Sequence, residues 1–440
     1  MKKLNLITLL LFFFTTAVFA QQSKIEFEEY DLDNGLHVIL HQDESTPIVA
    51  VTVTYHVGSK NERPDRTGFA HFFEHLMFEG TKNIDRGEYT KIVEKAGGTL
   101  NANTTSDRTL YYEILPSNQL ELGLWLESER MLHAKVDSTG IATQKKVVIE
   151  EYKQRYENRP YGTVLVEASK RAFDVHPYQW TTIGAPEHIR AAEDKEFLEF
   201  YNTFYVPNNA VLTIAGDIDI NETKQLVNKY FSGIPSGTND IYRPTAVEPI
   251  KEKEVRDTVY DNIQLPAVIQ AYHLPALGTD DYYAVDLLST LLSGGQSSRL
   301  NKTLVDEKQL ALFAASFPLP FEDPGLALNY AIPNMGIDPK VLEDAMNDEI
   351  ANVRTTLISD SELEKLKNQI ENQIVNSNTT LASRAQNLAI NYTFFKDANL
   401  VNTEIDKYMS VTKEDIKRVA NKYFRDDNRV VLYYLPKSQK

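Results

Sequence analysis

Cysteine is absent from the 440-residue chain. Its absence excludes disulfide frameworks, thiolate nucleophiles, cysteine-type zinc sites and iron–sulfur clusters, so a metal would have to be held by histidine and carboxylate side chains. Basic residues are also scarce: 46 lysines and arginines stand against 62 aspartates and glutamates, which leaves a net charge of −16. This balance argues against a general surface for nucleic acid or anionic membranes, and we expect no nucleic-acid partner.

Long hydrophobic runs are missing except near the start of the chain. There, two lysines precede a largely apolar run from Leu6 to Phe14, and Val18 and Ala20 supply the small residues of a secretory cleavage site. The run is shorter than the ~20 residues of a membrane-spanning helix. We therefore predict a signal peptide over residues 1–20 and no stable membrane anchor, with an uncleaved anchor as the alternative. Because Gln21 and not a lipid-accepting cysteine follows, a periplasmic location fits best and plain secretion is the alternative.

The rest of the chain has mixed helix and strand patterns in two halves of similar order. The first half contains strand-like runs, a helix near residues 66–78 and a mainly helical stretch over residues 117–173, and then a buried strand and a helix. The second half repeats the order of strand, helix, long helices and final strand, so internal duplication is the simplest interpretation. Residues 232–240 have linker composition. We predict one domain over residues 24–235 and a second over residues 250–440.

The residues that carry chemistry lie between Gly68 and Phe78, where His71, Glu74 and His75 occur together. Residues four apart lie one turn above each other on an α-helix, so the two imidazoles can reach one point, with Glu74 on the same face. Two imidazoles and a carboxylate bind zinc and leave a position for water, whose pKa falls to about 7, and Glu74 can take its proton as the water attacks a carbonyl. The pattern His-x-x-Glu-His therefore predicts one zinc ion and a hydrolase. The alternative is a pair of histidines that are hydrogen-bonded within a core.

A third protein ligand has to come from elsewhere in the chain, and Glu150 and Glu151 are the best acidic candidates. They lie on opposite flanks of the apolar face of the predicted helix, so helical periodicity alone does not separate them. A carboxylate at Glu151 can also simply pair with Arg155, one turn later. At this point both candidates stay open.

The chain resembles the pitrilysin/insulinase family of zinc peptidases, the inverzincins, which includes the mitochondrial processing peptidase. The resemblance covers nearly the whole chain and rests on the motif Gly68-x-Ala-His71-x-x-Glu74-His75-x-x-Phe78-x-Gly80-Thr81, on a glutamate 76 residues after the second histidine, and on the segments Gly97–Ala102, Tyr205–Asp217 and Gly294–Leu300. It implies His71, His75 and Glu151 as zinc ligands and Glu74 as the general base.

The same resemblance implies an α+β fold of two homologous domains, each a mixed β-sheet covered by helices, that face each other across a chamber. Residues 24–235 would form the zinc peptidase domain, and residues 250–440 a homologous domain without the zinc motif. The chain is similar to the short-chain branch of the family, whose members work as dimers.

The segment from residue 97 to residue 115 has the pattern of two strands joined by a polar turn. Sequence alone favours an ordinary hairpin. By resemblance, the strand that contains Asn101 and Ala102 is an open edge, to which an extended substrate pairs by main-chain hydrogen bonds. We therefore expect extended or unfolded peptides as substrates, with cleavage that depends little on their side chains.

Two departures from the family pattern affect the expected site. Gln144 stands where the family usually has a second glutamate, seven residues before Glu151; it can orient a ligand by hydrogen bonding but adds no charge. Val305 and Leu312 stand where complete active sites have an arginine and a tyrosine that bind substrate near the scissile carbonyl. The loss of such donors should weaken transition-state binding by roughly 3 kcal/mol each.

This gap predicts a heterodimer with a related subunit that lacks the zinc motif and supplies the arginine and the tyrosine. In the alternative, a homodimer uses another residue, such as Arg299 or Tyr330. The expected activity is that of an exported zinc metalloendopeptidase. The main rival is a non-catalytic, zinc-binding scaffold subunit, and the intact Glu74 argues against it because a purely structural zinc site needs no base.

Overall fold

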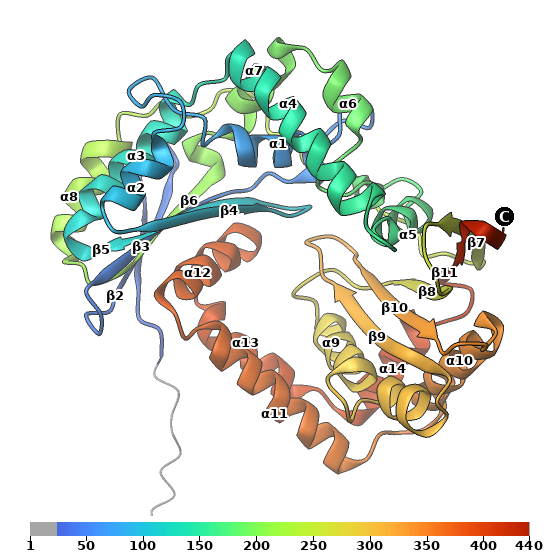
Figure 1. Cartoon of the computed structure of the whole chain (residues 1–440). Coiled ribbons are helices and arrows are strands. Elements are labelled where there is room, and N and C mark those ends of the chain that lie inside the picture. Colours follow the sequence, from blue (N-terminus) through green and yellow to red (C-terminus); the bar gives the residue numbers. More distant parts are fainter. Residues whose placement is uncertain (1–23, 440) are drawn as a thin grey trace, which may run out of the picture.

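The computed structural model describes residues 24–439, which form two β-sheets surrounded by helices (Figure 1). The predicted signal peptide, residues 1–20, lies outside the described residues. Among the described residues, no helix is both long enough and apolar enough to cross a membrane.

The first sheet has six strands in the order β1-β2-β6-β3-β5-β4. Strands β2 and β6 run parallel, and all other neighbours run antiparallel. Strand β3 is almost completely buried because both faces of the sheet are covered at this position. The six strands are β1 (Glu28–Asp31), β2 (His37–Gln42), β3 (Ile48–Tyr55), β4 (Thr99–Thr104), β5 (Thr109–Pro116) and β6 (Ala210–Gly216).

The second sheet has five strands in the order β7-β11-β8-β10-β9, with β7 and β11 parallel. This order repeats that of the first sheet without β1, because β2, β6, β3, β5 and β4 correspond in turn to β7, β11, β8, β10 and β9. The expected α+β fold with two homologous halves is therefore confirmed. The five strands are β7 (Val255–Asp261), β8 (Ala267–His273), β9 (Ala311–Leu319), β10 (Leu326–Pro333) and β11 (Arg429–Pro436).

Helices account for most of the remaining chain. The first half contains α1 (Phe69–Leu76), α2 (Tyr89–Lys95), α3 (Leu120–His133), α4 (Ser138–Tyr152), α5 (Val164–Ala172), α6 (Pro186–Ala191), α7 (Asp194–Phe204) and α8 (Ile220–Phe231). The second half contains α9 (Asp280–Ser293), α10 (Pro339–Thr355), α11 (Asp360–Ser377), α12 (Leu381–Phe395), α13 (Leu400–Ser410) and α14 (Lys413–Tyr423). Residues 235–254, which connect the halves, contain no helix or strand.

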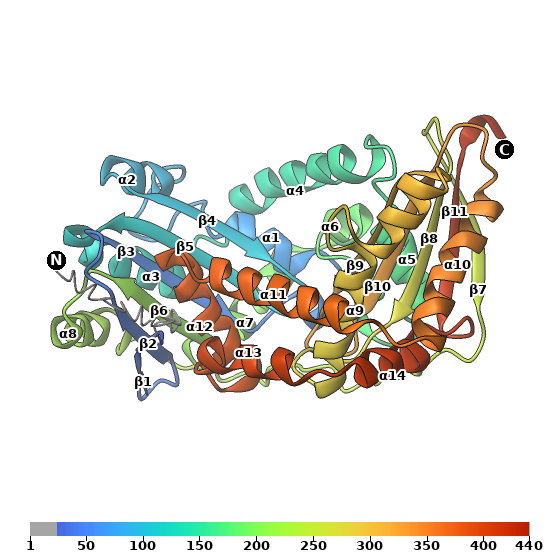
Figure 2. The ribbon, with the colours of Figure 1, turned by 90° about the horizontal axis from the view of Figure 1, so that it is seen from below.

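Each sheet is covered on one face by a helix from the other half of the sequence (Figures 1 and 2). Helix α12 packs on the first sheet, where Leu388 and Ala389 join a buried cluster with Ile39 and Val211. Helix α5 packs on the second sheet in a cluster that includes Ala168, Ala172, Ala267 and Val430. The predicted division at residues 235–250 stays a prediction, and this exchange of helices means that neither half is self-contained.

A buried group of charges also joins the halves. The Nζ atom of Lys60 lies 2.9 Å from Oδ1 of Asp107 and 2.6 Å from Oε2 of Glu322, which belongs to the loop between β9 and β10. The Glu322 carboxylate also lies 2.7 Å from Nε2 of His56. Because Asp107 lies in the turn between β4 and β5, the second half fixes the position of the hairpin that carries β4.

Candidate metal centre

The helix α1 carries both histidines, and its first turn is held by a residue from outside the helix. Glu62 is buried, and its carboxylate accepts hydrogen bonds from the backbone N–H groups of Gly68 and Ala70, both at 2.8 Å. Gly68 has a φ of 93°, and a Cβ there would lie 2.6 Å from the carbonyl oxygen of Ile183. Glycine is therefore required at this point, where the chain enters the helix. Sequence analysis missed Glu62, because a cap this far before the helix lies outside the usual capping pattern.

Aromatic packing sets which face of α1 is available for chemistry. The rings of Phe69 and Phe72 lie 4.5 and 4.4 Å from the ring of Phe197 on α7. This contact buries one face of the helix in the core of the first half. His71 and His75 lie on the other side and point toward the end of α4.

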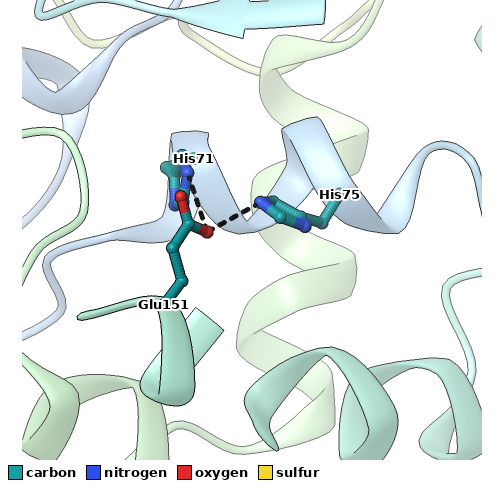
Figure 3. Close-up of side chains that lie close together, drawn as sticks. All are labelled: His71, His75 and Glu151. Atoms are coloured by element: carbon teal, nitrogen blue, oxygen red, sulfur yellow. Dashed lines mark ion pairs between the residues drawn. The ribbon is translucent and has the colours of Figure 1, made fainter. Parts of the chain in front are cut away.

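The structure brings the three predicted ligands together (Figure 3). The Nε2 atoms of His71 and His75 lie 3.6 and 3.2 Å from Oε2 of Glu151, in the last turn of α4. One ligand atom from each of the three side chains lies within 4.8 Å of the other two. Within residues 24–439 this is the only group of three or more histidine and carboxylate side chains with such spacing.

The geometry also distinguishes Glu151 from Glu150. The Glu150 carboxylate is exposed and lies 3.2 Å from Nζ of Lys153. The pairing of Glu151 with Arg155 is present as well, because Nη2 of Arg155 lies 3.0 Å from Oε1 of Glu151. That contact uses the other carboxylate oxygen and leaves Oε2 next to both imidazoles.

These three side chains fit a zinc ion. Burial, together with the neighbouring His75, lowers the pKa of His71 to about 4, although the Glu151 carboxylate acts in the opposite direction. His71 is therefore neutral at neutral pH, which is the form of imidazole that binds metals. Oε2 of Glu151 is buried and has no hydrogen bond among the described residues, and this free oxygen beside two imidazole nitrogens fits a metal ligand. Two neutral imidazoles and one carboxylate are a common donor set for catalytic zinc.

A cavity of about 960 Å³ opens over the three ligands. Glu74 lines this cavity from α1, between the two histidines in sequence, and Asn101 and Ala102 line it from β4. Strand β4 pairs only with β5, so its other edge is free of main-chain partners among the described residues. At this edge the N–H of Ala102 donates to Oδ1 of Asn101 at 2.9 Å. The predicted base and the predicted substrate strand thus share one cavity with the metal ligands.

The structure places the side chain of Gln144 against Glu79, and its predicted role beside the metal ligands stays a prediction. Its Nε2 donates to Oε1 of Glu79 at 2.6 Å, and its Oε1 is buried without a partner in the described chain. Among the described residues, no hydrogen bond joins Gln144 to a candidate ligand. Its side-chain amide is held instead by Glu79, which follows α1. Glu79 also pairs with Arg86, which binds Asp137, the residue that caps α4. Gln144 thus belongs to a network that joins the end of α1 to α4.

None of the second-half residues that the structure describes lines this cavity. Val305 lies in the short π-helix Asn301–Glu307, and Leu312 lies in β9 with 54% of its surface exposed. Of the two alternative donors, Arg299 is held 3.0 Å from Glu362, and the ring of Tyr330 packs 6.1 Å from the ring of Tyr161. None of the four residues lines the cavity with the candidate ligands.

Comparison with known proteins gives matches along nearly the whole chain. Residues 37–185 match the family described as Insulinase (Peptidase family M16), and residues 193–370 match the family described as Peptidase M16 inactive domain. The zinc protease PqqE of Helicobacter pylori is 32% identical over 98% of this chain and 98% of its own length. A probable mitochondrial-processing peptidase subunit beta of Schizosaccharomyces pombe is 24% identical over 94% of this chain and 92% of its own length.

A solved structure supports the same relationship. The crystal structure of a protease from Helicobacter pylori matches with a TM-score of 0.89 and 30% identity, and the match covers 93% of this chain and 100% of that chain. The similarity therefore includes both sheets and the helices that carry the candidate ligands.

Proposed function

Because the chain belongs to the insulinase family of zinc proteases, peptidase family M16, we propose that it is a zinc metalloendopeptidase that cleaves extended or unfolded peptides. The observation that carries this proposal is the convergence of His71, His75 and Glu151 in one cavity with Glu74. A purely structural zinc site has no need of a further carboxylate such as Glu74 in the same cavity.

Each of these residues has a separate task in the proposed reaction. His71, His75 and Glu151 would hold one zinc ion, which when bound polarises the scissile carbonyl and lowers the pKa of a water molecule to about 7. Glu74 accepts the proton from the attacking water and delivers it to the leaving nitrogen. The buried face of α1 keeps Glu74 and the two histidines in a fixed relation to each other.

The free edge of β4 supports a preference for extended substrates. A peptide that adds a strand to this edge would form main-chain hydrogen bonds beside Asn101 and Ala102, and these bonds do not depend on its side chains. To reach the N–H of Ala102, the peptide has to displace the side chain of Asn101. Most of the backbone of a folded protein is already paired in its own helices and sheets, so unfolded segments are the expected substrates.

We propose that the active form includes a related subunit. The cavity is lined by the first half alone, and the positions that carry substrate donors in the family are Val305 and Leu312 in this chain. A partner that supplies an arginine and a tyrosine would complete the site, with a homodimer as the second choice. The N-terminal sequence supports export, to the periplasm or, as the alternative, out of the cell.

A specific observation keeps a second function open. The missing arginine and tyrosine also suit a non-catalytic, zinc-binding scaffold subunit of a peptidase-like complex. Glu74 separates the two functions, because only the enzyme needs it.

The test compares the wild-type chain with Glu74→Gln, each with and without a related partner subunit. Elemental analysis should find one zinc per chain in both proteins. Digests of a peptide library, read by mass spectrometry, should show that Glu74→Gln loses about 10²–10⁴-fold in rate. The control Glu94→Gln removes an exposed carboxylate on α2 and should cleave as the wild type does. Zinc binding without cleavage in any pairing would establish the scaffold function instead.

A further inference from the structure

The α4 wall of the cavity carries two cations that the proposed reaction does not use. Lys146 on α4 and Arg155 on the following π-helix, Lys153–Glu157, both line the cavity. We propose that this wall selects peptides with a carboxylate side chain close to the scissile bond. The inference rests on the proposed function and adds a substrate class to it.

Both cations have free hydrogen-bonding capacity. The side chain of Lys146 is exposed and has no ion pair or hydrogen bond among residues 24–439. Arg155 has 66% of its side chain exposed and uses Nη2 for Oε1 of Glu151, while a guanidinium has five N–H donors. Short π-helical segments often mark functional sites, and this one begins two residues after the predicted ligand.

The carboxylates near this wall have other partners. Glu151 is held by Arg155 on one oxygen and directed at the imidazoles with the other. Glu150 is paired with Lys153 at 3.2 Å. Glu74 lies on α1, where it is needed for proton transfer. This wall carries as many carboxylates, Glu150 and Glu151, as cations, Lys146 and Arg155. Each carboxylate already has a cationic partner, which leaves Lys146 as an unpaired cation at the cavity within the described chain.

The opposite wall has no charge of its own. Residues 101–104 of β4 line the cavity with asparagine, alanine and threonine side chains. A peptide paired to this edge would lie between β4 and α4, and alternate side chains of a strand point to opposite faces. Side chains on the α4 side would meet Lys146 and Arg155, where a carboxylate is the complementary group.

The expected selectivity is modest because both cations are largely exposed. An exposed ion pair changes binding by about two- to fivefold, and salt screens it. Backbone pairing at β4 would still supply most of the affinity. The acidic preference is therefore a bias among extended peptides and not a strict requirement.

The test uses the full mature chain with the Glu74→Gln substitution, loaded with zinc, so that peptides bind without being cleaved. Fluorescent peptides differ only in Asp or Asn, or in Glu or Gln, at one position, which is moved along the sequence. Anisotropy should show that an acidic peptide binds two- to fivefold more tightly than its neutral match at about 50 mM salt, and that the difference disappears at about 500 mM.

Variants assign the preference to the wall. Lys146→Gln and Arg155→Gln should each reduce the preference for acidic peptides. The double variant Lys146→Glu with Arg155→Glu should bind lysine-containing peptides more tightly instead. Zinc content is measured for each variant, because Arg155 touches Glu151 whereas Lys146 touches no ligand. The matched control Lys170→Gln removes one exposed positive charge on α5, outside the cavity, and should keep the preference.

The failure of this inference differs from the failure of the proposed function. Three results would overturn the inference. They are equal binding of acidic and neutral peptides, binding of neither, and a preference that survives both Lys146→Gln and Arg155→Gln. The proposed function instead fails if the wild-type chain, with zinc and a partner, cleaves no peptide. Where cleavage occurs, the ratio of kcat/KM for each peptide pair should follow the binding ratio.

Discussion

At the scale of single residues, the candidate centre depends on one carboxylate, Glu151, that helical periodicity alone could not distinguish from its neighbour. Replacing Glu151 by Gln keeps the shape of the side chain but removes its negative charge. We expect zinc affinity, measured by competition with a chelator, to fall by more than the roughly 10–100-fold typical for loss of a second-layer partner. Glu150→Gln is the matched control and should bind zinc as the wild type does. If Glu150→Gln loses zinc and Glu151→Gln keeps it, the ligand assignment is wrong.

The contact between Gln144 and Glu79 leads to a prediction about the family's usual glutamate. Gln144→Glu would place a second carboxylate where the amide now lies 2.6 Å from Glu79. Like charges at this distance repel, so we expect the free energy of unfolding to fall by about 1–3 kcal/mol at neutral pH, measured by urea denaturation. The double variant Gln144→Glu with Glu79→Gln should recover most of this loss, and an equal loss in both variants would contradict the explanation.

The buried carboxylate of Glu343 leads to a prediction about the stability of the fold at low pH. This carboxylate is 1% exposed and lies 2.7 Å from Nη2 of Arg256. Burial alone would raise the pKa of Glu343, but hydrogen bonds from Arg256 and Tyr433 outweigh it and lower the pKa to about 2. Because this pKa is lower in the folded chain than the usual 4.5, the resulting stability is present above pH 4.5 and is lost as the pH falls toward 2.

The measurement compares urea unfolding of wild type and Glu343→Gln from pH 7 to pH 3. The variant should be less stable at pH 7 by about 1–3 kcal/mol, because it removes the charge that accepts hydrogen bonds from Arg256 and Tyr433. Arg256 is 41% exposed and keeps Glu254 as a second partner, which limits the loss. The difference should shrink as the pH falls from 4.5 to 3, because the unfolded wild-type chain takes up a proton at this carboxylate that the folded chain does not. A difference that stays constant with pH would show that Glu343 keeps an ordinary pKa.

At the scale of helices and strands, periodicity predicted much of the local structure but not its ends. The helix expected near residues 66–78 begins at Phe69, since the left-handed Gly68 and the Glu62 carboxylate set its start. The His-x-x-Glu-His spacing was informative because all three residues lie on one helix, so helical geometry alone sets their relative positions. Helical periodicity left Glu150 and Glu151 equivalent because their difference depends on where α1 lies, and only the family resemblance favoured Glu151.

The exchange of α5 and α12 could not be predicted for a related reason. An amphipathic pattern shows that a helix has an apolar face, but both sheets in this chain offer an apolar surface of similar composition. Leu388 and Ala389 mark the buried face of α12 equally well for either sheet. Which sheet each helix covers is decided by packing between residues that are hundreds of positions apart in the sequence.

The packing of α12 therefore predicts that a substitution in the second half of the sequence destabilises the first sheet. Leu388→Ala should lower stability by about 2–5 kcal/mol, because Leu388 is fully buried against the first sheet. Hydrogen exchange should increase in β2 and β6, although the substitution lies in the second half of the sequence. Gln386→Ala, on the same helix and only partly buried, is the control. Faster exchange confined to the second sheet would contradict the described packing.

At the scale of the whole molecule, the predicted domains should not fold separately. Residues 24–235 contain all the candidate ligands but lack α12, so Ile39, Ala50, Val211 and Ala215 would be exposed. We expect this fragment to aggregate when it is produced alone, and to become soluble when residues 250–440 are produced with it. Size-exclusion chromatography and circular dichroism provide the measurement. A monomeric, cooperatively folded fragment would show that the exchanged helix is dispensable.

The late position of α12 has a consequence for biosynthesis. Strands β2, β3 and β6 leave the ribosome or the translocation channel long before the helix that covers them, since α12 starts at Leu381. A nascent first half would present an uncovered apolar sheet face during this interval, and such surfaces are prone to association with other chains. Chaperones would have to shield that face until nearly the last helices have emerged.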